Sequence, residues 1–219
     1  MARVLITREH AQPLAHLLAA SGHGVMHVPL VELVATGLPR PSAAPDAVLV
    51  TSQAVARFAP DLADCIRQAR TAVVGQATAS ALRCIGVHAH YVGTAGGLDA
   101  LAGLEVTQQE CVWFIGALHP SPKLAERLDR LGVHRWSVYE NRVPVDAKRR
   151  LKMAEYDVVT FTSSSAVAAF VNEGGDVHTP AVVLGATTEA AARRAGFQRV
   201  QCAESHTLAA LAAAASAID

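Results

Sequence analysis

The sequence repeats itself with a displacement of about 110 residues. The segment Asp46–Phe58, DAVLVTSQAVARF, reappears as Asp157–Phe170, DVVTFTSSSAVAAF. The segment Ala72–Gly86 reappears in the same order as Val182–Gly196. Because self-similarity at a fixed spacing is typical of duplicated folding units, the chain is expected to consist of two related halves.

Within each half, short apolar runs alternate with Ala- and Leu-rich runs of helical period. Runs that are apolar on both faces are typical of parallel strands covered by helices on both sides. Strands are expected at 3–6, 24–28, 47–50, 71–74, 89–92, 111–114, 134–138, 158–161, 181–184 and 199–202. Helices are expected at 12–20, 54–69, 78–84, 98–104, 122–131, 165–171, 188–195 and 207–217. The predicted fold class is therefore α/β, with two doubly wound, flavodoxin-like parallel-sheet domains.

Two stretches interrupt this alternation at corresponding places in the repeat. Residues 30–43 contain Pro39 and Pro41 without a helical pattern, and residues 140–147 contain Pro144, so both are expected to be extended connectors. We therefore predict a discontinuous domain of residues 1–34 and 146–219, an inserted domain of residues 43–138, and linkers at 35–42 and 139–145. Two tethers between two bodies form a hinge, and such a hinge is expected to create a ligand cleft.

The charge balance limits the partners that the chain can have. It contains 19 Lys and Arg and 19 Asp and Glu, so it lacks the basic field by which proteins usually bind nucleic acid or anionic membranes. No apolar run approaches the ~18 residues of a membrane span or forms a secretory signal, so a cytoplasmic location is expected. The four cysteines form no C-x-x-C pair and are expected to be reduced.

Glycines and small hydroxyl residues follow four of the expected strands, where a helix begins. They are Thr51 and Ser52; Gly75 and Thr78; Ser163 and Ser164; and Gly185, Thr187 and Thr188. Each hydroxyl taken alone is most simply a helix N-cap. Open parallel sheets, however, bind ligands at the carboxyl ends of their strands, and free helix amides bind anions without net positive charge. The paired turns therefore indicate a ligand with several carboxylates or phosphates.

Patterns for other kinds of chemistry are absent from the sequence. There is no Walker-type loop, no G-x-G-x-x-G after the first strand, and no G-x-S-x-G. His88 and His90 would share one face of a strand, but with no third ligand nearby in the sequence a metal site is disfavoured. Neither a cofactor nor a metal is expected.

Two further side chains are candidates for the site. Arg8 follows the first strand, where it either forms a local ion pair or reaches an anionic ligand. Tyr139 stands where a strand leaves one body for the connector. Its phenol either packs at an interface or faces the cleft, where it could donate a hydrogen bond or a proton.

With these residues assembled, the chain resembles the uroporphyrinogen-III synthase family over nearly its whole length. The resemblance rests on the order of its motifs: Val4-Leu5-Ile6-Thr7-Arg8 with Gly22, the turns Val50-Thr51-Ser52 and Phe161-Thr162-Ser163, Val74-Gly75 to Thr78 with Gly86, Val138-Tyr139-Glu140, and Gly185 to Thr188 with Gly196.

The resemblance implies a cofactor-free lyase that converts the linear tetrapyrrole hydroxymethylbilane into uroporphyrinogen III, with loss of water and inversion of the last pyrrole ring. It implies a two-stranded linker, and a catalytic Tyr139 that helps the substrate hydroxyl to leave. The substrate, with its eight carboxylates, is expected to contact Arg8, Thr51, Ser52, Gly75, Thr78, Ser163, Ser164, Gly185, Thr187 and Thr188. A cytoplasmic monomer with transient contact to hydroxymethylbilane synthase is expected, without nucleic-acid or membrane partners.

Two alternatives remain open at this stage. One is a two-domain binder or sensor that closes on a polycarboxylate and does no chemistry. The other is a diverged, inactive relative. Many family members carry an Arg-Gly pair and another basic residue in the segment that here reads Trp113 to His119, where only Gly116 of that pattern is kept, with Lys123 as a possible substitute.

Overall fold

The computed structural model describes residues 1–218. Its strands are β1 (Arg3–Ile6), β2 (Gly24–His27), β3 (Glu32–Ala35), β4 (Ala47–Val50), β5 (Arg70–Val74), β6 (Tyr91–Gly93), β7 (Val112–Ala117), β8 (His134–Arg142), β9 (Val158–Phe161), β10 (Ala181–Val183) and β11 (Val200–Cys202). Its helices are α1 (Leu14–Ala20), α2 (Val55–Phe58), α3 (Leu62–Cys65), α4 (Gly75–Arg83), α5 (Gly97–Ala102), α6 (Pro122–Arg130), α7 (Ala147–Met153), α8 (Ser164–Asn172), α9 (Ala186–Arg194) and α10 (Leu208–Ser216).

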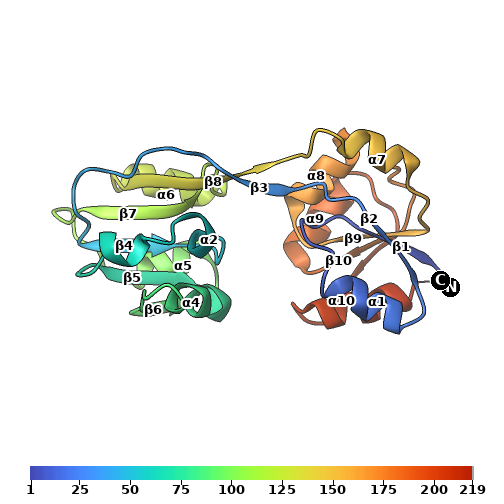
Figure 1. Ribbon diagram of the computed structural model, residues 1–219, viewed down its shortest axis with the longest axis horizontal. Helices are drawn as coiled ribbons and strands as arrows, with labels where there is room; N and C mark the ends of the chain where they lie inside the picture. Colours follow the sequence, from blue (N-terminus) through green and yellow to red (C-terminus); the bar gives the residue numbers. More distant parts are fainter. Residues whose placement is uncertain (219) are drawn as a thin grey trace. The chain divides into compact units, whose positions relative to one another are not determined.

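The chain divides into two compact units (Figure 1). The terminal unit contains Met1–Leu33 and the part of the chain from Arg142 onward, and the central unit contains Val34–Asn141. Each unit has its own sheet. The predicted α/β class is confirmed.

The terminal unit has a five-stranded sheet in the order β11-β10-β9-β1-β2, with every neighbouring pair parallel. Counted along the chain within this unit, the order is 2-1-3-4-5, which is the flavodoxin-like arrangement. Parallel strands of this kind present all their carboxyl ends at one edge of the sheet.

Alternating residues of the terminal sheet pack into two separate cores. Val4 and Ile6 of β1 face α1 and α10, which run side by side on that face (Figure 1). Leu5 faces the opposite core, which is built with α7, α8 and α9. Because both faces are covered, these strands are mostly apolar on both faces, as the sequence predicts.

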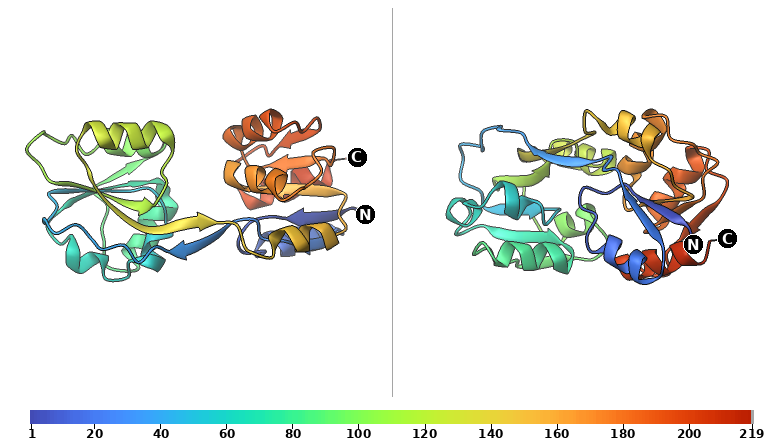
Figure 2. Two further views of the ribbon diagram at one scale, coloured as in Figure 1. Left: turned by 90° about the horizontal axis from the view of Figure 1, so that it is seen from above. Right: turned by 45° about the vertical axis from the view of Figure 1, so that its right-hand side comes forward.

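The central unit has a six-stranded sheet in the order β3-β8-β7-β4-β5-β6. One face packs on α5 and α6, and α2 to α4 lie on the other face (Figure 2). Strands β4, β5 and β6 are the repeats of β9, β10 and β11, and β7 and β8 stand where β1 and β2 stand in the terminal sheet. The two units therefore have the same spatial order of strands, but the chain begins at a different strand of that order in each unit.

Three elements differ from the expectation. The single helix expected at 54–69 is two short helices, α2 and α3, because Pro60 lacks an N–H and its ring clashes with the preceding helical turn. Helix α7 was not expected, because only Ala147 and Leu151 of its AKRRLKM sequence are buried and the apolar period is therefore weak. Strand β3 lies in the expected first connector and pairs with β8.

The pairing of β3 with β8 continues beyond the end of β3. The backbone N–H of Thr36 donates to the carbonyl of Val138 at 3.3 Å, and the Thr36 hydroxyl donates to the carbonyl of Ser137. This pairing is the two-stranded linker that the family resemblance implies. The exact domain and linker boundaries remain predictions.

Candidate functional site

The structure brings the predicted site residues to two edges, one in each unit. In the terminal unit, Arg8 follows β1, Ser163 follows β9, and the Gly185 turn follows β10, and these three strands are adjacent and parallel. In the central unit, Thr51 follows β4 and Gly75 follows β5. Each unit therefore presents its candidates at the carboxyl edge of its own sheet, which is where open α/β sheets bind ligands.

The chain of the terminal unit reverses its winding direction between β1 and β9, and such a switch point is the usual ligand position in this fold. Two buried side-chain bonds fix the strands here: the Thr7 hydroxyl donates to the carbonyl of Thr160 at 2.7 Å, and the Thr160 hydroxyl donates to the carbonyl of Leu5 at 2.9 Å. These bonds hold the backbone that carries Arg8.

Arg8 has an unsatisfied nitrogen at this switch point. Its Nη1 atom is buried, and no hydrogen-bond partner lies near it among residues 1–218. Burial lowers the pKa of the Arg8 guanidinium from its ordinary value, and the nearby Glu9 carboxylate partly offsets that effect. A buried donor without a partner costs about 1–3 kcal/mol, and a bound anion would remove that cost.

The hydroxyls that begin α8 and α9 are partly used by the protein itself. Ser163 Oγ accepts from the N–H of Ala166 at 3.3 Å, which is a helix N-cap. Ser164 Oγ donates to the carbonyl of Thr187 at 3.3 Å, so the two turns are joined. Thr188 is 6% exposed, whereas Thr187 is exposed. Thr187 is therefore the hydroxyl of α9 that a ligand can reach directly.

His206 lies beside the Gly185 turn and was missed by the sequence analysis. A Cβ at position 185 would lie 2.8 Å from His206 Nδ1, so the imidazole fits against the glycine backbone. His206 is exposed and follows β11, the edge strand of the same parallel sheet. Its position after a predicted strand was the signal that could have found it.

The switch point of the central unit is chemically different. Leu49 and Thr160 are equivalent in the repeat, and they pair with Phe114 and Ile6. Two residues further on, Gly116 therefore takes the place of Arg8. A Cβ there would lie 2.8 Å from Phe114 Cζ and 3.3 Å from the Thr51 hydroxyl oxygen. The central unit thus has a small, neutral position where the terminal unit has a guanidinium.

Tyr139 is buried in the central unit, at 6% exposure. It lies on β8 opposite Ala117, the last residue of β7, just after a register shift in that strand pair. Its ring stacks on Phe58 with the centroids 5.5 Å apart. Burial raises the pKa of Tyr139, and the side chain of Ser52 partly offsets this rise. The phenol therefore stays protonated at neutral pH.

The turn after β5 depends on a glycine. Gly75 has φ +76°, a left-handed conformation that costs other residues about 1–2 kcal/mol. It begins α4, whose first amides have no partner within the helix. Thr78, one turn later, is 4% exposed. The backbone of this turn is thus better placed than the Thr78 hydroxyl to contact a ligand.

A neighbouring loop of the central unit binds a carboxylate of the protein itself. Asp99 Oδ2 accepts from the N–H of Thr94 at 2.7 Å and of Ala95 at 3.1 Å, after β6. These backbone bonds lower the pKa of Asp99. Main-chain amides at this edge therefore suffice to stabilise a carboxylate without a cation.

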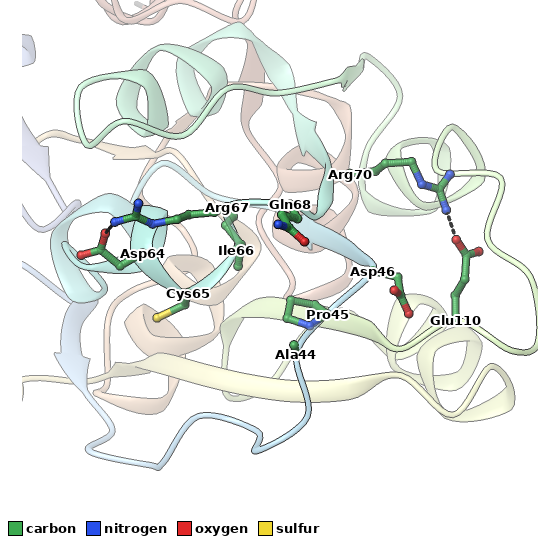
Figure 3. A pocket seen from close by; sticks show the side chains of 10 residues that line it. All are labelled: Ala44, Pro45, Asp46, Asp64, Cys65, Ile66, Arg67, Gln68, Arg70 and Glu110. Carbon is green, nitrogen blue, oxygen red and sulfur yellow. Dashed lines mark hydrogen bonds and ion pairs between the residues drawn. The ribbon is translucent and has the colours of Figure 1, made fainter.

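A cavity of about 610 Å³ lies at the opposite, amino edge of the central sheet (Figure 3). Its charged groups pair with one another: Arg67 Nη2 donates to Asp64 Oδ1 at 2.6 Å, and Arg70 pairs with Glu110. None of the predicted site residues lines it.

Two kinds of feature are not found within residues 1–218. No helix in this range is long and apolar enough to cross a membrane. No group of three or more His, Cys, Asp or Glu side chains in the same range is placed to hold a metal ion.

Comparison with known proteins identifies the family. Residues 12–213 match the family model described as uroporphyrinogen-III synthase HemD. The chain belongs to the uroporphyrinogen-III synthase family. Because the match runs through both units, the family assignment gives the chain the synthase function. No curated protein matches the sequence.

Two solved uroporphyrinogen III synthases share the fold. The one from Helicobacter pylori 26695 aligns with a TM-score of 0.71 at 18% identity, over 98% of both chains. A mutant enzyme from the extremely thermophilic bacterium Thermus thermophilus aligns with a TM-score of 0.67 at 20% identity, over 96% of both chains. At these identities the two structures establish the fold of this family member.

Proposed function

We propose that this synthase is a carbon–oxygen lyase that closes hydroxymethylbilane to uroporphyrinogen III, with loss of water and inversion of the last pyrrole ring. The observation that carries the proposal is the family match across residues 12–213. No observation favours a non-catalytic binder or sensor. The placement of the candidate residues at the carboxyl edge of each sheet supports binding of carboxylates at that edge.

A chain with no net charge can bind carboxylates through neutral donors. The free amides at the starts of α4, α8 and α9 are such donors. Arg8 adds one positive charge with an unsatisfied nitrogen. We propose that Arg8, the Gly75 turn, the Ser163–Ser164 turn and the Gly185–Thr188 turn bind substrate carboxylates.

In the proposed chemistry, much of the driving force belongs to the substrate. The pyrrole nitrogen pushes electrons toward the hydroxymethyl carbon, and its C–O bond breaks. Tyr139 donates its proton to the departing oxygen, which leaves as water. The protein otherwise holds the chain so that the last ring is attacked in its inverted orientation. We further propose that the enzyme is a cytoplasmic monomer that contacts hydroxymethylbilane synthase only transiently.

The test is conversion of hydroxymethylbilane made in situ from porphobilinogen by a deaminase. Closure without a synthase gives the type I isomer, so the ratio of uroporphyrin III to I after oxidation measures directed ring inversion. We expect the type III isomer to predominate. Type I alone would contradict the proposal. Binding of uroporphyrinogen III without turnover would then indicate a binder or an inactive relative.

The Thr187→Val variant tests the terminal turns. A lost hydrogen bond to a charged group costs about 1.5–3 kcal/mol, so affinity for uroporphyrinogen III should fall about ten- to hundredfold by calorimetric titration. Thr187→Ser keeps the hydroxyl and should bind as the wild type does. Thr179→Val, before β10 at the other edge of the sheet, is the matched control. Unchanged affinity in Thr187→Val would show that this hydroxyl binds no carboxylate.

A further inference from the structure

The backbone of Tyr139 is fixed at an irregularity of the central sheet. Gly116 of β7 pairs with Ser137 of β8. The next residue, Ala117, pairs with Tyr139, so β8 has one extra residue at this point. The carbonyl of Tyr139 accepts from the N–H of Leu118 at 2.7 Å. Irregularities of this kind re-aim a side chain and are frequent beside active sites. The sheet thus sets where the Tyr139 side chain begins, and contacts of the ring itself set its plane.

Phe58 of α2 makes such a ring contact. The two rings are stacked, with their centroids 5.5 Å apart and an angle of 27° between their planes. Stacking of this kind is a preferred arrangement of aromatic pairs, and a near-parallel neighbour hinders rotation of the Tyr139 ring. Burial raises the pKa of Tyr139, and the Phe58 ring contributes to that burial because it lies against the phenol.

Phe58 is itself held in place by the short helix α2. Val55 and Ala59, one turn apart, are fully buried and anchor this helix in the core. The N–H of Phe58 donates to the carbonyl of Ala54 at 3.2 Å. The guanidinium of Arg57 lies 4.8 Å from the centre of the Phe58 ring, within the range of a cation–π contact. The ring that touches Tyr139 therefore has a fixed backbone and a second contact of its own.

We propose that Phe58 is a positioning residue for Tyr139, whose stacked ring directs the phenol toward the leaving oxygen of the substrate. The inference rests on the proposed function, in which Tyr139 donates a proton to that oxygen. A general acid must lie within hydrogen-bond reach of the atom that it protonates, and a misplacement of about 1 Å can cost about 10²-fold in rate. Because the Phe58 ring has no oxygen or nitrogen, it holds the phenol without competing for its proton.

The kinetic test compares kcat with KM. Phe58→Leu keeps an apolar side chain and removes the stack, so kcat should fall about tenfold or more, while KM changes less than about twofold. Phe58→Tyr keeps the ring and should recover most of the turnover. Tyr91→Leu, on the edge strand β6 of the same sheet, is the control and should leave kcat unchanged. A raised KM with unchanged kcat would make Phe58 a substrate contact and overturn the inference.

A double-mutant cycle separates positioning from general support of the fold. In the Tyr139→Phe background, Phe58→Leu should lower kcat no further, because the hydroxyl that it directs is already gone. An equal loss of kcat in both backgrounds would show that Phe58 acts through the fold alone, and the inference would fail.

A third measurement does not need a folded Phe58 variant. In the wild-type protein with labelled tyrosine and phenylalanine, a nuclear Overhauser effect is expected between the Tyr139 ring and one phenylalanine ring, since the stacked pair is in contact. The tyrosine signal lost in Tyr139→Phe assigns it, and absence of the effect would overturn the inference. If Tyr139→Phe has full activity, the proposed acid step and the inference both fail; if it is impaired but Phe58→Leu is fully active, the inference alone fails.

Discussion

Replacing Tyr139 by Phe is expected to lower kcat by at least tenfold, and by up to about 10²–10⁴-fold if the phenol carries the whole general-acid contribution. The substitution keeps the ring that stacks on Phe58 and removes only the hydroxyl. Because burial raises the pKa of Tyr139, the wild-type phenol holds its proton through the neutral range. The measurement is single-turnover conversion of hydroxymethylbilane by the Phe variant.

The control for this variant is its stability. Removing this one hydroxyl should cost no more than about 0.5–1.5 kcal/mol of unfolding free energy in urea, far too little to empty the folded state. Tyr156→Phe, in the terminal unit before β9, should leave kcat unchanged. A fully active Tyr139→Phe would mean that Tyr139 is a packing residue and that substrate folding alone directs closure.

Replacing Arg8 by Met is expected to lower kcat/KM by about 10²-fold or more, since a guanidinium–carboxylate contact contributes two charge-assisted hydrogen bonds of about 1.5–3 kcal/mol each. The free energy of unfolding should not fall with kcat/KM. The variant removes a buried nitrogen that has no partner within residues 1–218, so its unfolding free energy should be unchanged or higher by about 1–3 kcal/mol. A lower kcat/KM together with an unchanged or higher unfolding free energy would identify Arg8 as a residue whose role is to bind the substrate.

Arg8→Lys retains charge without the planar fork and should recover only part of the affinity. Arg194→Met, on the exposed end of α9, is the matched control and should change neither quantity. A destabilised Arg8→Met variant with normal kcat/KM would instead assign Arg8 a structural role.

The fold was predictable because its signals are repeated. The displacement of about 110 residues brings β4 and β5 onto β9 and β10, and strands that are apolar on both faces specify parallel sheets. Helix α7 was missed because its sequence is mostly basic, and its two buried residues give only a weak apolar periodicity. To predict the break between α2 and α3, the steric effect of Pro60 would have had to outweigh the Ala-rich helical pattern.

The site was predictable only as a set of turns. A strand followed by a small hydroxyl residue places Ser52 and Ser163 at a carboxyl edge, but the pattern does not say what each hydroxyl contacts. The Ser164 hydroxyl, for example, donates to the carbonyl of Thr187 in another turn. The burial of Thr78 and Thr188, against the exposure of Thr187, depends on how each helix is rotated on its sheet.

The sequence repeat did not reveal one difference between the two units. By register, Gly116 stands in the central sheet where Arg8 stands in the terminal sheet. The absence of basic residues near Gly116 was, from the sequence, a reason to consider an inactive relative. Phe114 and the Thr51 hydroxyl already occupy the space that a side chain at Gly116 would need. A neutral position here therefore follows from the packing of this chain.

The central claim is that the polycarboxylate binds at the carboxyl edges of the two sheets. The most direct measurement is the change in backbone amide NMR shifts of the nitrogen-15-labelled protein as uroporphyrinogen III is added. We expect the largest changes at Arg8, Gly75 to Thr78, and Gly185 to Thr188. The largest changes around Asp46, Arg67 and Arg70, in the cavity at the amino edge of the central sheet, would contradict the claim.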